Sequence, residues 1–183
     1  DDQTVNADEE VAVDITHVGR DKDLVNVFTV HTQMGATIPQ TASGLGESLA
    51  MSADGKRMII GAYTEGAGLA RVYNWNGTSW VQLGADIKGA SSGDHYGEYV
   101  SISSNGNRVA IAGPDHDGKK GHVEIYDWDG TSWIQTGSSI LGDSAGDKLG
   151  FRGVHLSGDG KVLAVASFKG GYINTYIWNG TAW

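Results

Sequence analysis

Short apolar runs punctuated by glycine-containing turns recur along most of the chain. In three places a small polar turn precedes such a run: Ser52–Gly55, Ser103–Gly106 and Ser157–Gly160. Each turn ends in Asp-Gly or Asn-Gly, a pair that favours a tight hairpin because both residues tolerate positive φ. The runs that follow are almost continuously apolar, which is typical of inner strands covered on both faces. No segment shows the 3.6-residue period of an amphipathic helix, so the pattern predicts an all-β chain.

The tryptophans reveal an internal repeat. All six lie in three copies of one hexapeptide: Trp75–Trp80, Trp128–Trp133 and Trp178–Trp183. A tyrosine stands two residues before the first tryptophan of every copy (Tyr73, Tyr126 and Tyr176). Successive copies start 53 and 50 residues apart, at residues 75, 128 and 178. A fixed period of this length is typical of repeat architectures such as propellers.

Each unit predicts four short strands joined by hairpins, which is the composition of a propeller blade. We therefore expect a β-propeller-like array of four-stranded antiparallel blades with a repeat of about 50 residues. Val25–Phe28 matches Val123–Tyr126 in a worn copy near the N-terminus. We expect a polar N-terminal arm, residues 1–10, followed by a blade-repeat domain, residues 11–183. This domain divides into a partial degenerate blade (11–44), two blades (45–90 and 96–142) and an incomplete blade (149–183).

Recurrence at a fixed phase suggests that the aromatic residues pack between blades. We expect Tyr126 and Trp128 to be largely buried, with Trp133 packing beside them across the hairpin. An alternative is a carbohydrate platform, since flat rings stack on sugar faces. That alternative requires Trp75, Trp128 and Trp178 to be exposed in a row.

Composition narrows the class of partner. The chain has 13 basic and 22 acidic residues, a net charge of −9, and no basic stripe, so we expect no nucleic-acid partner. It has no cysteine, which excludes disulfides and thiolate metal sites. No apolar stretch approaches the roughly 18 residues of a membrane-spanning helix, so we expect no membrane span.

The units resemble FG-GAP repeats, the blades of integrin α-like propellers, and look closest to tandem versions in secreted proteins of marine microbes and algae. The resemblance rests on dipeptides in the "FG" position (Leu45-Gly46, Tyr96-Gly97 and Leu149-Gly150) and on a loosely placed "GAP" (Gly61-Ala62 and Ala112-Gly113-Pro114). It implies an extracellular or cell-surface location and a binding or adhesion role.

FG-GAP blades that bind calcium carry D-x-D-x-D-G between their first two strands. This chain keeps only the end of that loop, at Asp54-Gly55, Asn105-Gly106 and Asp159-Gly160. Calcium takes six to eight oxygen ligands, so these turns predict hairpins and no bound cofactor. Asp115 and Asp117 are the remaining candidates for a calcium site; the alternative for their loop is a solvated turn.

The sequence predicts no catalytic activity. Asp129–Trp133 resembles the Asp-box of sialidase-like propellers, which is a folding feature of a hairpin. A sialidase would need three clustered arginines and a tyrosine nucleophile, and the arginines here lie mostly at turns (Arg20, Arg57, Arg71, Arg108 and Arg152). The six histidines lack metalloprotease spacing, and no G-x-S-x-G elbow is present.

Asn76 and Asn179 begin N-x-T sequons at expected hairpin tips and are candidate N-glycosylation sites. Asn-Gly is also the favoured pair of a tight hairpin, and Asp129 replaces asparagine in the middle copy.

These observations predict a non-catalytic extracellular module of a surface, adhesion or filament assembly. The alternatives are a carbohydrate-binding propeller and, third, a sialidase-like hydrolase. The repeat starts at its second strand near residue 11 and stops early in its fourth strand at Trp183. Unpaired blade edges invite strand pairing, so we expect them to meet each other in a closed ring, a neighbouring protomer, or further sequence. Residues 1–10 are a candidate arm toward that partner.

Overall fold

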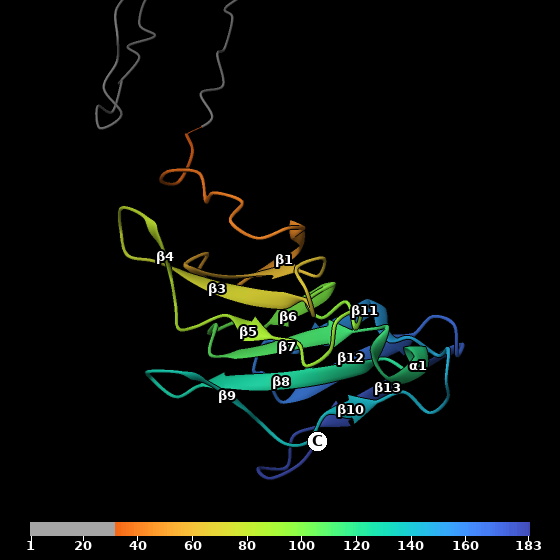
Figure 1. Ribbon diagram of the computed structural model, residues 1–183. Helices are drawn as coiled ribbons and strands as arrows, with labels where there is room; N and C mark the ends of the chain where they lie inside the picture. The colour runs from red at the N-terminus through yellow and green to blue at the C-terminus, as the bar shows by residue number, and fades with distance from the viewer. Residues whose placement is uncertain (1–31) are drawn as a thin grey trace, which may run out of the picture. The chain divides into compact units, whose positions relative to one another are not determined.

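Three antiparallel sheets follow one another along the chain (Figure 1). The computed structural model describes residues 32–183, so the expected arm 1–10 and most of the expected partial blade 11–44 lie outside the described residues. Residues 33–183 form a compact unit of their own, to which the description below refers.

The sheets consist of consecutive strands, as the repeat predicts. The first sheet contains β1 (Leu45–Met51), β2 (Arg57–Ala62), β3 (Leu69–Trp75), β4 (Trp80–Gln82) and β5 (Ile87–Lys88). The second contains β6 (Tyr99–Ile102), β7 (Arg108–Gly113), β8 (His122–Trp128), β9 (Trp133–Gln135) and β10 (Ile140–Leu141). The third contains β11 (Leu149–Leu156), β12 (Val162–Ser167) and β13 (Tyr172–Ile177). A single irregular turn, α1 (His116–Lys119), precedes β8. The expected all-β fold of antiparallel, blade-like units is confirmed.

The position of the fourth strand differs from the simple expectation, because two short strands share it. In the first sheet β4 pairs with one end of β3, at Tyr73–Trp75, and β5 pairs with the other end, at Leu69 and Ala70. β9 and β10 divide the same position along β8. The chain leaves the edge of the sheet between the two pieces and then returns to it.

The hairpin turns between the first two strands form as predicted, and their serines explain why. Ser52 donates its hydroxyl proton to Asp54 Oδ1 over 2.7 Å, and Ser52 Oγ accepts from the Arg57 amide over 2.9 Å. Gly55 closes the turn at φ +69°. Ser103–Gly106 and Ser157–Gly160 repeat this arrangement.

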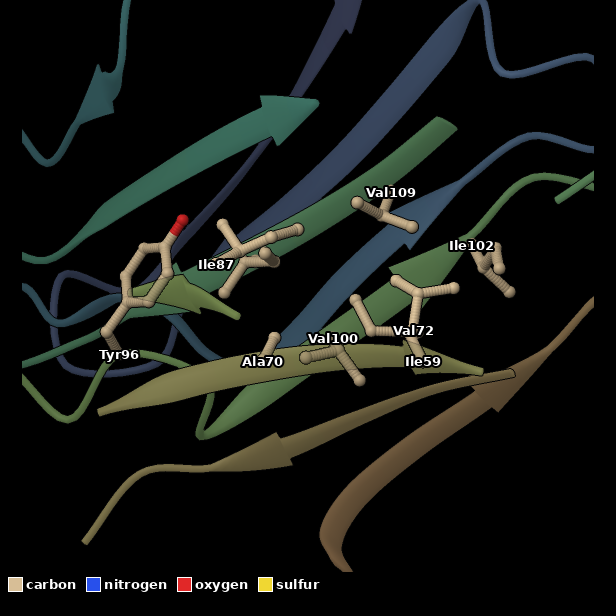
Figure 2. Packing of buried hydrophobic residues seen from close by; sticks show 9 residues of the cluster. Ile59, Ala70, Val72, Ile87, Tyr96, Val100, Ile102 and Val109 are labelled. Atoms are coloured by element: carbon tan, nitrogen blue, oxygen red, sulfur yellow. The ribbon is translucent and has the colours of Figure 1, made fainter. Parts of the chain in front are cut away.

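The hydrophobic core lies between the sheets, and β7 contributes to both sides of it. Val109 and Ile111 pack against the first sheet, on Ile59 and Val72 among others (Figure 2). The alternate residues Ala110 and Ala112 pack against the third sheet. This alternation explains why β7 is apolar at odd and even positions alike.

The aromatic residues lie less deep than the sequence suggested. Tyr126, Trp128 and Trp133 are half-buried, so the expectation that Tyr126 and Trp128 are largely buried is wrong in degree. The expected pairing is confirmed: the Trp128 and Trp133 rings lie 5.3 Å apart across the hairpin. The other two tryptophan pairs are arranged alike, and none of the six side chains is exposed. The row of exposed rings that a carbohydrate platform requires is not found.

In the described part of the chain, α1 is far too short and polar to cross a membrane.

Candidate functional site: junctions between sheets and an open sheet face

Each junction between sheets is closed by a residue-glycine pair at the start of a unit. Gly97, at φ +90°, lies directly against the backbone of the first sheet, where a Cβ on it would overlap the Leu69 carbonyl oxygen. Gly150, at φ +88°, lies against the side chains of Ala112 and Val123 of the second sheet. The residues before these glycines, Tyr96 and Leu149, are fully buried. Two of the three dipeptides that carry the FG-GAP resemblance thus fill a groove in the preceding sheet.

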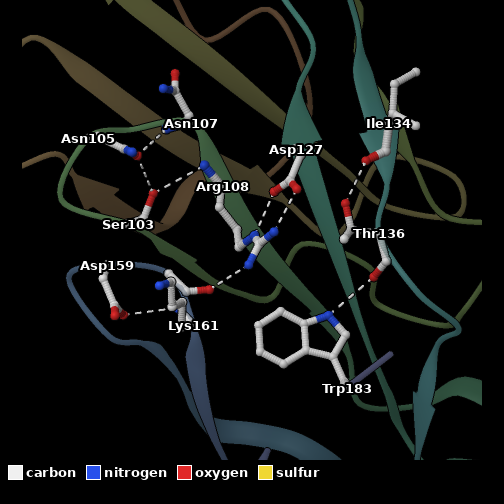
Figure 3. A network of polar contacts seen from close by, with 11 residues as sticks. Ser103, Asn105, Asn107, Arg108, Asp127, Ile134, Thr136, Asp159, Lys161 and Trp183 are labelled. Atoms are coloured by element: carbon white, nitrogen blue, oxygen red, sulfur yellow. Dashed lines mark hydrogen bonds and ion pairs between the residues drawn. The ribbon is translucent and has the colours of Figure 1, made fainter. Parts of the chain in front are cut away.

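Arginine and tryptophan hold the opposite end of each junction (Figure 3). Arg108 forms two 2.6 Å hydrogen bonds with Asp127 and donates to the Gly160 carbonyl of the third sheet over 2.8 Å. Its guanidinium also lies 5.3 Å from the centre of the Trp178 ring. Trp183 donates its indole proton back to the Thr136 carbonyl over 3.2 Å. Arg57 and Trp133 make the corresponding backbone hydrogen bonds at the previous junction.

A chain of hydrogen bonds between turns gives the stack a direction. The Ala53 amide donates to the Ser104 carbonyl over 2.9 Å, and the Ser104 amide donates to the Gly158 carbonyl over 2.8 Å. Each turn therefore presents a carbonyl to the sheet before it and an amide to the sheet after it.

Residues 33–38 repeat the end of a unit, a feature that was not predicted from the sequence. Gly35 contacts Trp75, as Gly84 contacts the tryptophan pair of the second sheet. The Gln33 amide donates to Thr37, and the corresponding glutamines make the same contact four residues on (Gln82 to Asp86 and Gln135 to Ser139). The signal in the sequence is the shared Gln-x-Gly, in Gln33-Met34-Gly35, Gln82-Leu83-Gly84 and Gln135-Thr136-Gly137.

The third sheet exposes a face whose equivalent in each of the other two sheets is covered by the next sheet. Ile173 occupies the position of Val123 and is 74% exposed, whereas Val123 is fully buried. Ile173, Ala166, Phe168 and Tyr172 line part of a groove of about 530 Å³. In register and phase, Ala166 and Ile173 match Ala112 and Val123, the residues against which Gly150 packs. We call this feature the open groove.

A basic and aromatic cluster borders the open groove. The Arg152 guanidinium lies 5.2 Å from the centre of the Phe151 ring and 5.6 Å from that of Phe168. Phe151 also meets Tyr99 of the second sheet edge to face, at 5.6 Å. Arg152 has φ +64° because the third unit carries one residue more than the second between its Leu-Gly or Tyr-Gly pair and its turn. Val162 replaces the arginine of the other junctions.

The two candidate calcium ligands face different cations. Asp115 Oδ1 lies 2.5 Å from the Lys148 ammonium, and Asp115 Oδ2 lies 3.3 Å from His95. Asp117 is exposed and pairs with Lys120 at 2.9 Å. Among residues 32–183, no three acidic or histidine side chains are grouped as a metal site. The arrangement stabilises the loop around α1.

A network of polar side chains lies partly buried between the first and second sheets. Tyr96, Tyr126 and Ser139 all donate to the Glu124 carboxylate, over 2.8–2.9 Å. Although burial raises it, these hydrogen bonds bring the pKa of Glu124 below its usual value. Burial raises the pKa of Tyr126 to about 12. Glu124 is therefore a fixed charge and Tyr126 a fixed hydrogen-bond donor at neutral pH.

His122 is the buried base beside this network. Its side chain is 3% exposed, stacks on His116 at 4.1 Å, and meets the edge of Tyr96. Within the described residues its Nε2 has no hydrogen-bond partner. Burial lowers the pKa of His122, and the charge of His116 acts in the same direction, against the opposing charges of Glu124 and Asp94.

We expect His122 to make the fold sensitive to mild acid. Because the folded state holds its pKa below about 6.5, protons bind the unfolded chain preferentially. The free energy of unfolding is therefore highest above that pH and falls as the pH drops toward 5. The contribution of His122 to this slope is at most about 1.4 kcal/mol per pH unit. His122→Leu, which copies Leu69 of the first unit, should flatten this dependence. Urea unfolding of both chains at pH 5, 6 and 7 measures it; equal slopes would contradict the assignment.

Asn76 and Asn179 are exposed at hairpin tips, as the sequons require. Asn76 Oδ1 accepts from the Thr78 and Ser79 amides at 2.9 and 2.8 Å. Asp129 and Asn179 cap their hairpins with the same bonds. The side-chain oxygen at each tip thus caps the hairpin. Glycosylation of Asn76 and Asn179 stays a prediction.

The arginines of the described residues serve separate ion pairs and junctions. Arg71 pairs with Asp86 at 2.7 Å, Arg108 with Asp127, and Arg152 with the aromatic cluster. Arg20 lies outside the described residues.

Comparison with solved structures identifies the fold. A putative 6-phosphogluconolactonase from Bacteroides uniformis ATCC 8492 matches with a TM-score of 0.55 and 19% identity, covering 81% of this chain and 42% of that one. The β-propeller domain of the Trilobed protease from Pyrococcus furiosus matches with a TM-score of 0.50 and 13% identity, covering 77% and 41%. The chain thus spans about two fifths of the length of each. No family model and no curated protein matches this chain. The likeness shows a propeller-type fold.

Proposed function

We propose that this chain is a non-catalytic binding or structural module that meets other proteins through an open sheet face, in an extracellular or cell-surface assembly. One observation carries the proposal: Ile173 and Ile177 of β13 are 74% and 69% exposed, and Phe168, which directly follows β12, is 56% exposed. A contiguous apolar patch on a folded protein is typical of a surface that another molecule covers. This favours protein binding over catalysis.

The proposal includes that the units are repeats of the FG-GAP type. Tyr96-Gly97 and Leu149-Gly150, which carry the resemblance, occupy equivalent places at two junctions. The proposed module works without bound calcium, because Asp115 and Asp117 each face a lysine.

A second candidate, carbohydrate binding, is favoured by one groove. It encloses about 330 Å³ between Trp128 and Trp178 and is lined by Arg108, Asp127 and Asp159. Aromatic rings beside paired polar groups suit a sugar. The test is a glycan array probed with wild-type and Trp178→Ala chains. Glycans that bind the wild type and do not bind the variant would support this candidate.

Site-directed photo-crosslinking tests the proposed function. A benzophenone amino acid at position 173 should crosslink to protein in the chain's native setting. The same amino acid at position 134, which is 51% exposed on β9, is the matched control and should crosslink far less. Absence of any protein adduct at 173, or equal adducts at both positions, would overturn the proposal.

A further inference from the structure

We infer that the open groove of the third sheet binds the first sheet of a second copy of this chain, head to tail, with Leu45-Gly46 entering as Leu149-Gly150 enters the second sheet. This inference rests on the proposed function and names its partner.

The internal junctions define what the groove accepts. Tyr96-Gly97 and Leu149-Gly150 both enter a groove formed by the second and third strands of the preceding sheet, with glycine at φ near +90°. The open groove presents the matching residues, Ala166 and Ile173, and in the described part of the chain nothing fills it. The fitting occupant is therefore a further unit of the same kind.

The first sheet presents such a unit. Gly46 has φ +103°, close to the values of Gly97 and Gly150, and an added Cβ would meet no atom of the described residues within 4 Å. Leu49 and Met51 beside it are 59% and 49% exposed, although their equivalents Val100 and Ile102 are buried. Among residues 32–183, the first sheet thus shows an apolar face that complements the groove.

Charge favours the same pairing. The residue after the pair's glycine is Glu47 in the first sheet and Glu98 in the second. Burial raises the pKa of Glu98, and the charges of Asp115 and Glu47 act in the same direction, against those of His95 and Lys148. At the open groove the residue after the pair's glycine is Phe151, and Arg152, which follows it, lines the groove. A second copy whose Leu45-Gly46 enters the groove would therefore bring its Glu47 toward this cation.

The turns complete the match. The Gly158 amide continues the chain of hydrogen bonds that runs from Ala53 through Ser104, and the Ala53 carbonyl is the acceptor that a second copy offers. Donor meets acceptor only in a head-to-tail arrangement, which forms a heterologous interface. Val162 provides apolar contact in place of the arginine, so this junction should be weaker than the internal ones.

Sedimentation equilibrium of the whole chain over about 1–200 µM tests the inference. We expect reversible association in the wild type. Ile173→Glu and Ala166→Arg should each weaken it at least about 30-fold, because a charge would be buried in the groove. Ile134→Glu, the exposed control on β9, should change it less than about threefold. Circular dichroism checks that all three variants are folded.

A charge exchange tests the register. Arg152→Glu and Glu47→Arg should each weaken association about fivefold, and the double variant should restore it to within about twofold of the wild type. A wild type that is monomeric throughout, groove variants that associate normally, or a double variant weaker than both single variants would each overturn the inference. A monomeric chain that still crosslinks at position 173 to another protein would overturn only the inference. A monomeric chain without adducts would overturn the proposed function as well.

Discussion

Gly97→Ala should destabilise the fold by about 4–5 kcal/mol, because the new Cβ would overlap the Leu69 carbonyl oxygen and force the first two sheets apart. A backbone atom cannot move aside as a side chain can. The φ of +90° adds strain that any residue other than glycine would feel.

Gly130→Ala separates these two effects. Gly130 has φ +106° at a hairpin tip, and an added Cβ would meet no atom within 4 Å. It should cost only the conformational strain, about 1–3 kcal/mol. Urea unfolding followed by tryptophan fluorescence compares the two variants. Equal losses would mean that the close approach of the sheets at Gly97 contributes nothing beyond backbone strain.

Leu149→Ala should cost about 2–5 kcal/mol, since it removes a fully buried side chain between the second and third sheets and leaves a cavity. Leu141→Ala is the matched control: the same atoms are removed from a side chain that is 49% exposed, and the cost should stay below about 1 kcal/mol. Thermal unfolding by circular dichroism measures both. A Leu149 variant as stable as the control would show that the third sheet does not depend on this contact.

Local features of the fold could be predicted from the sequence because their causes are local. The Ser-x-Asp-Gly turns carry their own hydrogen bonds, as Ser52 and Asp54 show, and the Asn-Gly-Thr-Ser hairpins are capped by Asn76. Strand order followed from the repeat. The second part of the fourth strand was missed because Ile87–Lys88 and Ile140–Leu141 are only two residues each.

The candidate site depended on contacts between units, which a single unit does not encode. Ile173 and Val123 are both apolar strand residues, and only the packing of the third sheet separates an exposed position from a buried one. Lys148 lies far from Asp115 in sequence, so the ion pair between them was not foreseen. The depth of Trp128 was overestimated because large aromatic rings also serve at the rims of junctions.

The two-sided packing of β7 bears on how such a chain can vary in length. Val109 and Ile111 face one neighbour and Ala110 and Ala112 the other, so each junction uses its own set of side chains. Insertion or loss of one whole unit of about 50 residues would leave every remaining junction intact, provided that the new neighbours carry matching faces. Insertion or loss of one residue inside a strand such as β7, by contrast, would reverse its alternation and damage two junctions at once. The architecture therefore permits growth and shrinkage by duplication or deletion of whole units, and resists single-residue changes within strands that pack on both sides.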